Sequence, residues 1–199
     1  MIHKRGSGMK IDVLYREETC ADGSQQCVWE FRPGREFLET LLRDLFENHY
    51  ESLTFGPSIQ GAVFECRVKA PPRRISFLDG YLTVDLGDWH FHLCIGKHRG
   101  DAMHPCPPEL ARWRRCARVM LLRIYQNPPI AGHAPVSYSM ALLNGRNEQM
   151  VTFYLPNPYF DEHYRVLETA DWGKLALWNH IRTSYLGLET DPGPFADLE

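Results

Sequence analysis

The chain has 199 residues, 44% of them hydrophobic and 12% aromatic, which is enough apolar material for one buried core and excludes wholesale disorder. Its formal net charge of −3 argues against a dedicated nucleic-acid partner, because such proteins carry a basic surplus that neutralises phosphates. The sequence contains no apolar run of about 18 residues, so no membrane span is predicted.

The six cysteines indicate a reducing compartment. None of them forms a C-x-x-C pair, and a chain with an ordinary core needs no disulfide framework. The N-terminus also lacks the apolar segment of a signal peptide. We therefore expect a cytoplasmic protein. No linker or internal repeat divides the sequence, which predicts a single domain over residues 1–199 with flexible tails at about 1–9 and 187–199.

The first half of the sequence predicts a strand, a helix and then a series of strands. Residues 11–18 are strand-like, whereas residues 35–50 place apolar side chains at helical spacing and predict an amphipathic helix. Four segments rich in Val, Phe, Tyr and Ile follow, divided by Pro-Pro, Asp-Gly and Gly-Asp pairs. They are residues 61–70, 74–80, 81–86 and 89–95. Connections this short join antiparallel neighbours.

The second half predicts a short helix, three strands and closing helices. Residues 107–117 begin with proline and an acid, as a short helix does, and residues 118–126 favour a strand. An Asn-Gly pair supplies the turn of a hairpin over residues 136–155. Residues 171–187 begin with Asp, end with Gly and predict a final helix. Together the elements predict an α+β fold, in which an N-terminal amphipathic helix and C-terminal helices pack on a predominantly antiparallel β-sheet of six to eight strands.

The segment HFHLC, residues 90–94, carries the strongest candidate for a functional site. Alternate side chains of a strand point to opposite faces, so the segment should send apolar groups to the core and donor groups to the other side. The apolar set is Trp89, Phe91, Leu93 and Ile95. The donor set is His90, His92 and Cys94. Two histidines at this spacing can bind one metal ion, and His98, beyond the glycine that ends the strand, can reach the same site.

A complete metal shell needs a further protein ligand or a water molecule. The candidate ligands are Asp88, Cys94, His104, Glu109, His133 and Glu148, of which we favour Cys94, His133 and Glu148. A shell rich in nitrogen suits Fe²⁺ or Zn²⁺ better than Ca²⁺ or Mg²⁺. The competing interpretation is an ordinary strand with two exposed histidines, in which His133 and Glu148 are solvated turn residues.

An arginine-rich segment follows the histidines, and it includes Arg112, Arg115 and Arg118. The planar guanidinium group binds carboxylate and phosphate groups with two hydrogen bonds at once. These three arginines therefore indicate a site for a small anionic substrate. A solvated helix face, paired with the many acids of the chain, explains the same residues without a substrate.

Three known families contain short motifs that this strand resembles. The His-x-His pair resembles that of the cupins, although no acid follows between Cys94 and Gly100. The alternation of His with apolar residues resembles the histidine-triad nucleotide hydrolases, with Cys94 at the place of the third His. HFHLCI also resembles the histidine strand of single-strand endonucleases, which implies a nucleophilic tyrosine such as Tyr164 or Tyr125. Each resemblance covers fewer than ten residues, and none assigns a family.

These features predict a small cytoplasmic metalloprotein. The leading interpretation is a metal-dependent hydrolase or oxygenase, in which His90, His92 and His98 hold a divalent Fe²⁺ or Zn²⁺ that acts on a small anionic substrate. One alternative is a non-catalytic accessory module that binds haem or metal or docks to another protein. A further alternative is a metal-dependent nuclease-like protein that cuts single strands. The sequence names neither the substrate nor the oligomeric state.

Overall fold

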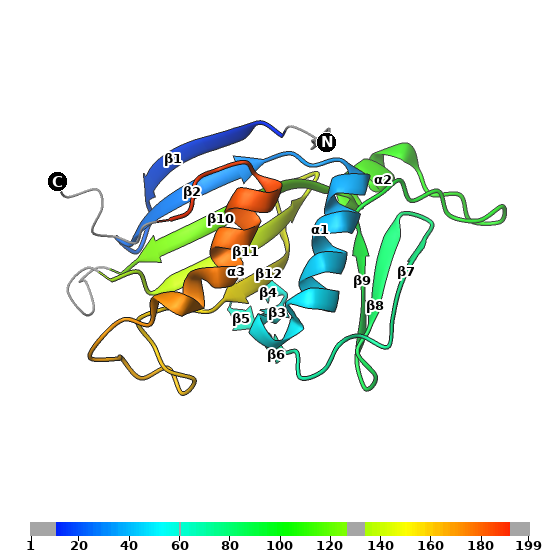
Figure 1. Ribbon diagram of the computed structural model, residues 1–199. Helices are drawn as coiled ribbons and strands as arrows, with labels where there is room; N and C mark the ends of the chain where they lie inside the picture. The colour runs from blue at the N-terminus through cyan, green and yellow to red at the C-terminus, as the bar shows by residue number, and fades with distance from the viewer. Residues whose placement is uncertain (1–10, 60, 127–133, 192–199) are drawn as a thin grey trace, which may run out of the picture.

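The structure is a computed structural model that describes residues 11–59, 61–126 and 134–191. These residues form twelve β-strands in three antiparallel sheets, together with three short α-helices (Figure 1). The main sheet has seven strands in the order β1-β2-β10-β11-β12-β3-β6. Its strands are β1 (Val13–Thr19), β2 (Gln25–Phe31), β3 (Thr54–Gly56), β6 (Cys66–Arg67), β10 (Cys116–Tyr125), β11 (Ser137–Asn144) and β12 (Gln149–Leu155).

The two smaller sheets lie outside the main one. The first is the pair β4 (Ser58–Ile59) and β5 (Ala62–Val63), and the second contains β7 (Arg74–Leu78), β8 (Tyr81–Asp85) and β9 (His90–Cys94). The apolar face of the β7-β8-β9 sheet packs beside helix α1 (Arg35–Asn48), where the rings of Phe46 and Phe91 have centroids 5.6 Å apart (Figure 1). This sheet therefore completes the core from the side.

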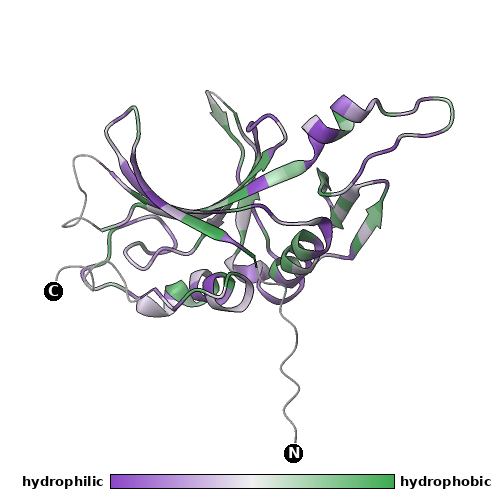
Figure 2. Ribbon diagram, turned by 90° about the horizontal axis from the view of Figure 1, so that it is seen from above, coloured by the Kyte–Doolittle hydropathy of each residue, from purple (hydrophilic) through white to green (hydrophobic). Residues whose placement is uncertain are grey.

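Helix α1 and the C-terminal helices lie on one side of the curved main sheet (Figure 2). Helix α1 buries the apolar stripe that its sequence predicts, namely Phe37, Leu38, Leu41, Leu42, Leu45 and Phe46. The 3₁₀-helix η1 (Tyr50–Ser52) follows it. Near the C-terminus, a 3₁₀-helix η2 (Trp172–Leu175), helix α3 (Ala176–His180) and a π-helix η3 (Ile181–Tyr185) form one continuous helical segment. The short helix α2 (Pro108–Arg114) precedes β10.

The predicted α+β fold with a single sheet of six to eight strands is wrong. The described residues form three sheets, and their α-helices have only 14, 7 and 5 residues, so the fold is largely β. The amphipathic segment forms α1, which follows β1 and β2 in the chain and is not the first element of the fold. The strand predicted over residues 61–70 is divided into β5 and β6, which pair with different partners and so belong to different sheets.

β11 and β12 form the predicted hairpin, but the residue with the left-handed backbone at its turn is not the predicted one. Asn147, and not the Asn-Gly pair, has the left-handed backbone, with φ of 63°. Gly145 is required for another reason, because a Cβ atom there would lie 2.2 Å from the carbonyl oxygen of Arg112. The glycine thus permits helix α2 to approach the hairpin.

The face of the main sheet opposite α1 and α3 carries an ion-pair network around the buried Glu30. Glu30 is only 6% exposed and accepts two hydrogen bonds of 2.7 Å from Arg118 and one of 2.8 Å from Arg16. Hydrogen bonds from Arg118 are the largest influence on the pKa of Glu30, which lies below its usual value despite burial of the carboxylate. The carboxylate therefore links three adjacent strands, β1, β2 and β10.

Replacing Glu30 by Gln is expected to lower the free energy of unfolding by about 2 kcal/mol at pH 7, because Arg118 loses its ionised partner. Since the pKa of Glu30 is lower in the folded protein, its contribution is complete above the unfolded pKa of about 4.3 and is lost as the pH falls below it. Urea unfolding at pH 7 and pH 4 checks both points. Exposed Glu36→Gln is the control, and equal stability of E30Q and wild type at pH 7 would refute the network's role.

Candidate metal centre

The predicted histidine strand forms β9, and most of its side chains alternate as expected. Leu93 is buried, whereas His90 and His92 are exposed with ring centroids 5.2 Å apart. The expected inward orientation of Trp89 is wrong, because this residue precedes the strand. Its side chain is 57% exposed, and its ring contacts that of Phe64. Cys94 is buried at the end of the strand, and burial raises the pKa of its thiol. It is therefore a poor metal ligand.

The other predicted ligands have partners elsewhere. His98 Nδ1 lies 2.8 Å from Asp79 Oδ2, and the same carboxylate accepts hydrogen bonds from the backbone N–H groups of Arg99 and Gly100. Glu148 accepts hydrogen bonds from Trp113 and from Asn144 at the hairpin turn. His133 lies outside the described residues. No three of the predicted ligands within the described ranges bring their donor atoms within 4.8 Å of one another.

The three predicted substrate arginines also separate. Arg118 is bound to Glu30 and donates a further hydrogen bond of 2.8 Å to Asn147 Oδ1. Arg112 lies on α2 and Arg115 directly follows it, and both are exposed. Arg118 thus holds the sheet together, and the structure does not direct the three guanidinium groups to one point.

A different group of potential ligands lies between the two helical segments. Asp44 and His49 come from the C-terminal end of α1, and His180 is the last residue of α3. One ligand atom of each lies within 4.8 Å of the other two, which occurs for no other trio of His, Cys, Asp or Glu in the described parts of the chain. Asp44 Oδ2 is 2.7 Å from His180 Nε2 and 3.9 Å from His49 Nε2.

These separations suit a metal ion. Bonds of about 2.1 Å to a common ion place neighbouring ligand atoms roughly 3.0–3.4 Å apart in octahedral or tetrahedral geometry. The two distances from Asp44, 2.7 and 3.9 Å, lie on either side of that range. Two histidines and one carboxylate form the donor set of many open iron sites and some zinc sites.

Surrounding side chains orient the carboxylate of the group. Tyr185 donates a 2.8 Å hydrogen bond to Asp44 Oδ2, and Asn48 donates one of 2.8 Å to Oδ1. Burial opposes ionisation of Asp44, but the hydrogen bonds from His180, Asn48 and Tyr185 together hold its pKa below the usual value. Burial, with the neighbouring His180, lowers the pKa of His49. The shift of His49 favours the neutral imidazole with which a histidine binds a metal.

The backbone at this group is irregular. Helix α3 continues directly into the π-helix, where Leu186 N–H donates to the carbonyl oxygen of Ile181 at 3.3 Å. Short π-helical segments are rare and occur frequently at functional sites. Here the wider turn follows His180 and brings Tyr185 to the same carboxylate. The sequence offered one signal, an Asp and a His five residues apart at a helix end, but their partner lies 136 residues further along the chain.

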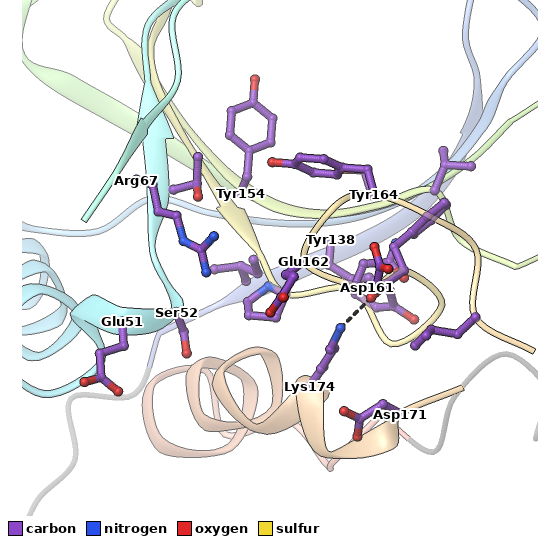
Figure 3. A pocket seen from close by; sticks show the side chains of 18 residues that line it. Glu51, Ser52, Arg67, Tyr138, Tyr154, Asp161, Glu162, Tyr164, Asp171 and Lys174 are labelled. Atoms are coloured by element: carbon purple, nitrogen blue, oxygen red, sulfur yellow. Dashed lines mark hydrogen bonds between the residues drawn. The ribbon is translucent and has the colours of Figure 1, made fainter. Parts of the chain in front are cut away.

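A cavity of about 560 Å³ is lined in part by residues that lie close in sequence to this group (Figure 3). Glu51 and Ser52, which follow His49 in η1, line one side of it. Asp171 and Lys174, which precede α3, line another side. A cavity of this volume can hold a small organic molecule.

None of the described helices combines the length and the apolar character needed to cross a bilayer.

No curated protein and no solved structure matches the chain. A family described as a family of unknown function (DUF7676) matches residues 15–187, which is most of the sequence. The chain therefore belongs to DUF7676, a family of unknown function.

Proposed function

We propose that this protein binds one divalent transition metal ion, Fe²⁺ or Zn²⁺, through Asp44, His49 and His180. The observation that carries the proposal is the convergence of two histidines and one carboxylate within 4.8 Å, from helices distant in sequence. The proposal retains the metal binding expected from the sequence, but its ligands lie at the α1–α3 interface and not on β9. Three protein ligands leave positions open for water or substrate, as catalytic metal sites require.

An open metal site of this kind is suited to an enzyme of the hydrolase or oxygenase type. A metal ion with free positions polarises a bound substrate and lowers the pKa of a bound water, and iron also binds O₂. The cavity of about 560 Å³ would hold a small substrate. The six cysteines are all free thiols, which supports the cytoplasmic location that we propose for it.

The exposed pair His90 and His92 is the second candidate for metal binding. His92 Nδ1 lies 2.7 Å from Thr83 Oγ1, which leaves its Nε2 available, and both rings are open to solvent. A site with two protein ligands is weaker than one with three, and no carboxylate of the described residues joins this pair within 4.8 Å. We therefore rank it below the α1–α3 group.

Titration with Co²⁺, a spectroscopic substitute for zinc, distinguishes the two sites with matched variants. Each variant removes two histidines: His49→Ala/His180→Ala from the proposed centre, and His90→Ala/His92→Ala from β9. We expect the first to weaken binding by about 100-fold or more and the second to leave it unchanged, since even outer-shell changes cost about 10–100-fold.

The opposite pattern would move the metal to β9, and unchanged binding in both variants would refute the proposal. Asp44→Asn is a milder variant in case loss of His180 loosens α3. It preserves the shape of the side chain and reduces its charge, so binding should weaken by about tenfold or more while circular dichroism stays that of the wild type.

A further inference from the structure

We propose that the cavity of about 560 Å³ lined by Arg67 and Tyr164 binds a small organic anion that carries a planar ring. Eighteen residues line the cavity, from η1, β3, β6, the ends of β11 and β12, and the segment 156–174. As the substrate site of a metal enzyme this inference rests on the proposed function, but ligand binding itself requires no metal. The two proposals can therefore fail separately.

The anionic group is inferred from Arg67. Figure 3 shows its guanidinium group directed into the cavity from the edge strand β6. Arg67 forms no hydrogen bond or ion pair with any of the described residues, and it is exposed to solvent. A guanidinium group without a partner at the wall of a cavity is suited to a carboxylate, sulfonate or phosphate group.

The other charged residues of the cavity wall are engaged elsewhere. Lys174 donates a hydrogen bond to the carbonyl oxygen of Phe160. Asp161 accepts hydrogen bonds from Arg165 and from backbone N–H groups, and Asp171 accepts one from Gly173 N–H. Glu51 accepts a hydrogen bond of 3.2 Å from the Tyr50 hydroxyl, and Glu162 lies 3.6 Å from His163. Arg67 is thus the cavity charge left available for a ligand.

The planar ring is inferred from two tyrosines on the same side of the cavity, Tyr154 and Tyr164 (Figure 3). Tyr164 is 77% exposed, and its backbone has a φ of 60°, a conformation that a bulky residue rarely adopts. Asp161 holds this turn through hydrogen bonds to the N–H groups of His163 and Arg165. Strained backbone that persists because neighbours hold it is concentrated at ligand sites. An uncovered aromatic ring offers a stacking surface for a planar ligand.

The test uses two fluorescent probes that differ by one charged group. 8-Anilinonaphthalene-1-sulfonate is an aromatic anion, and N-phenyl-1-naphthylamine is the same ring system without the sulfonate. Both are titrated into the full-length protein with and without EDTA. We expect saturable binding of the anionic probe, with Arg67→Gln weakening it by about tenfold and leaving the neutral probe unaffected. Exposed Arg32 does not line the cavity, so Arg32→Gln is the matched control and should bind as the wild type does.

Tyr164→Gly separates a binding role from a structural one. Glycine adopts the left-handed backbone without strain, and the tyrosine ring buries little surface, so the melting temperature should not fall. Affinity for both probes should decrease, because the stacking surface is lost. The inference is overturned when no saturable binding occurs, when R67Q binds the sulfonate like the wild type, or when Y164G retains full affinity. If the wild-type protein binds the anionic probe but binds no Co²⁺, only the metal proposal is refuted.

Discussion

Replacing Trp178 by Ala is expected to lower the free energy of unfolding by about 4 kcal/mol. Trp178 is fully buried where α3 meets the main sheet. Its ring contacts Trp29 and Tyr138 edge-on, with centroids 5.5 and 5.0 Å apart, and its Nε1–H donates a 3.0 Å hydrogen bond to Asp191. Truncation leaves a cavity among aromatic rings and removes a hydrogen bond from a buried carboxylate.

Guanidinium chloride unfolding, followed by circular dichroism, measures this loss. Trp172→Ala is the matched control on the same helical segment, because Trp172 is 43% exposed and should cost less than about 1 kcal/mol. Trp178→Phe keeps most of the packing and should lie between the two. A loss below about 1 kcal/mol for W178A would contradict the packing of α3 on the sheet.

Asp191→Asn should cost about 3 kcal/mol, because it removes the negative charge from a buried ion pair. Asp191 is 6% exposed, and its carboxylate accepts two hydrogen bonds, of 3.1 and 3.0 Å, from Arg123 Nη1. Arg123 is equally buried, so the substitution leaves an uncompensated guanidinium charge in the interior. Burial lowers the pKa of Arg182, and the charge of the same carboxylate opposes this shift.

A double-mutant cycle measures this interaction directly. Arg123→Met and Asp191→Asn should each destabilise the protein, and the double variant should cost clearly less than the sum of the two, since it leaves neither charge alone. Equilibrium unfolding of the four proteins gives the coupling energy. Strictly additive losses would show that Arg123 and Asp191 do not depend on each other for stability.

Local sequence patterns predicted individual elements of this fold but not their assembly. The apolar stripe of residues 35–50 specifies α1, and alternation of apolar residues specifies β9, because both depend on neighbours within a few residues. The division into three sheets depends on which strands pair, and strands as short as β5 and β6 carry too few residues to specify a partner. Trp89 shows the same limit, since it lies just outside β9 and escapes the alternation.

The candidate site was harder to predict than the elements that carry it. His90, His92 and Cys94 attract notice because they are close in sequence, but the end of β9 buries Cys94 and the turn at Asp79 holds His98. The group at Asp44, His49 and His180 arises only when α1 and α3 pack on the same side of the sheet. A single sequence contains no signal for that contact.

One measurement tests the metal centre most directly: anomalous X-ray diffraction at the zinc absorption edge from crystals of the wild-type protein grown with Zn²⁺. An anomalous peak between Asp44, His49 and His180, about 2.1 Å from each ligand atom, is the result that the proposal predicts. A peak between His90 and His92 with none at the α1–α3 interface, or no ordered peak at either place, would contradict it.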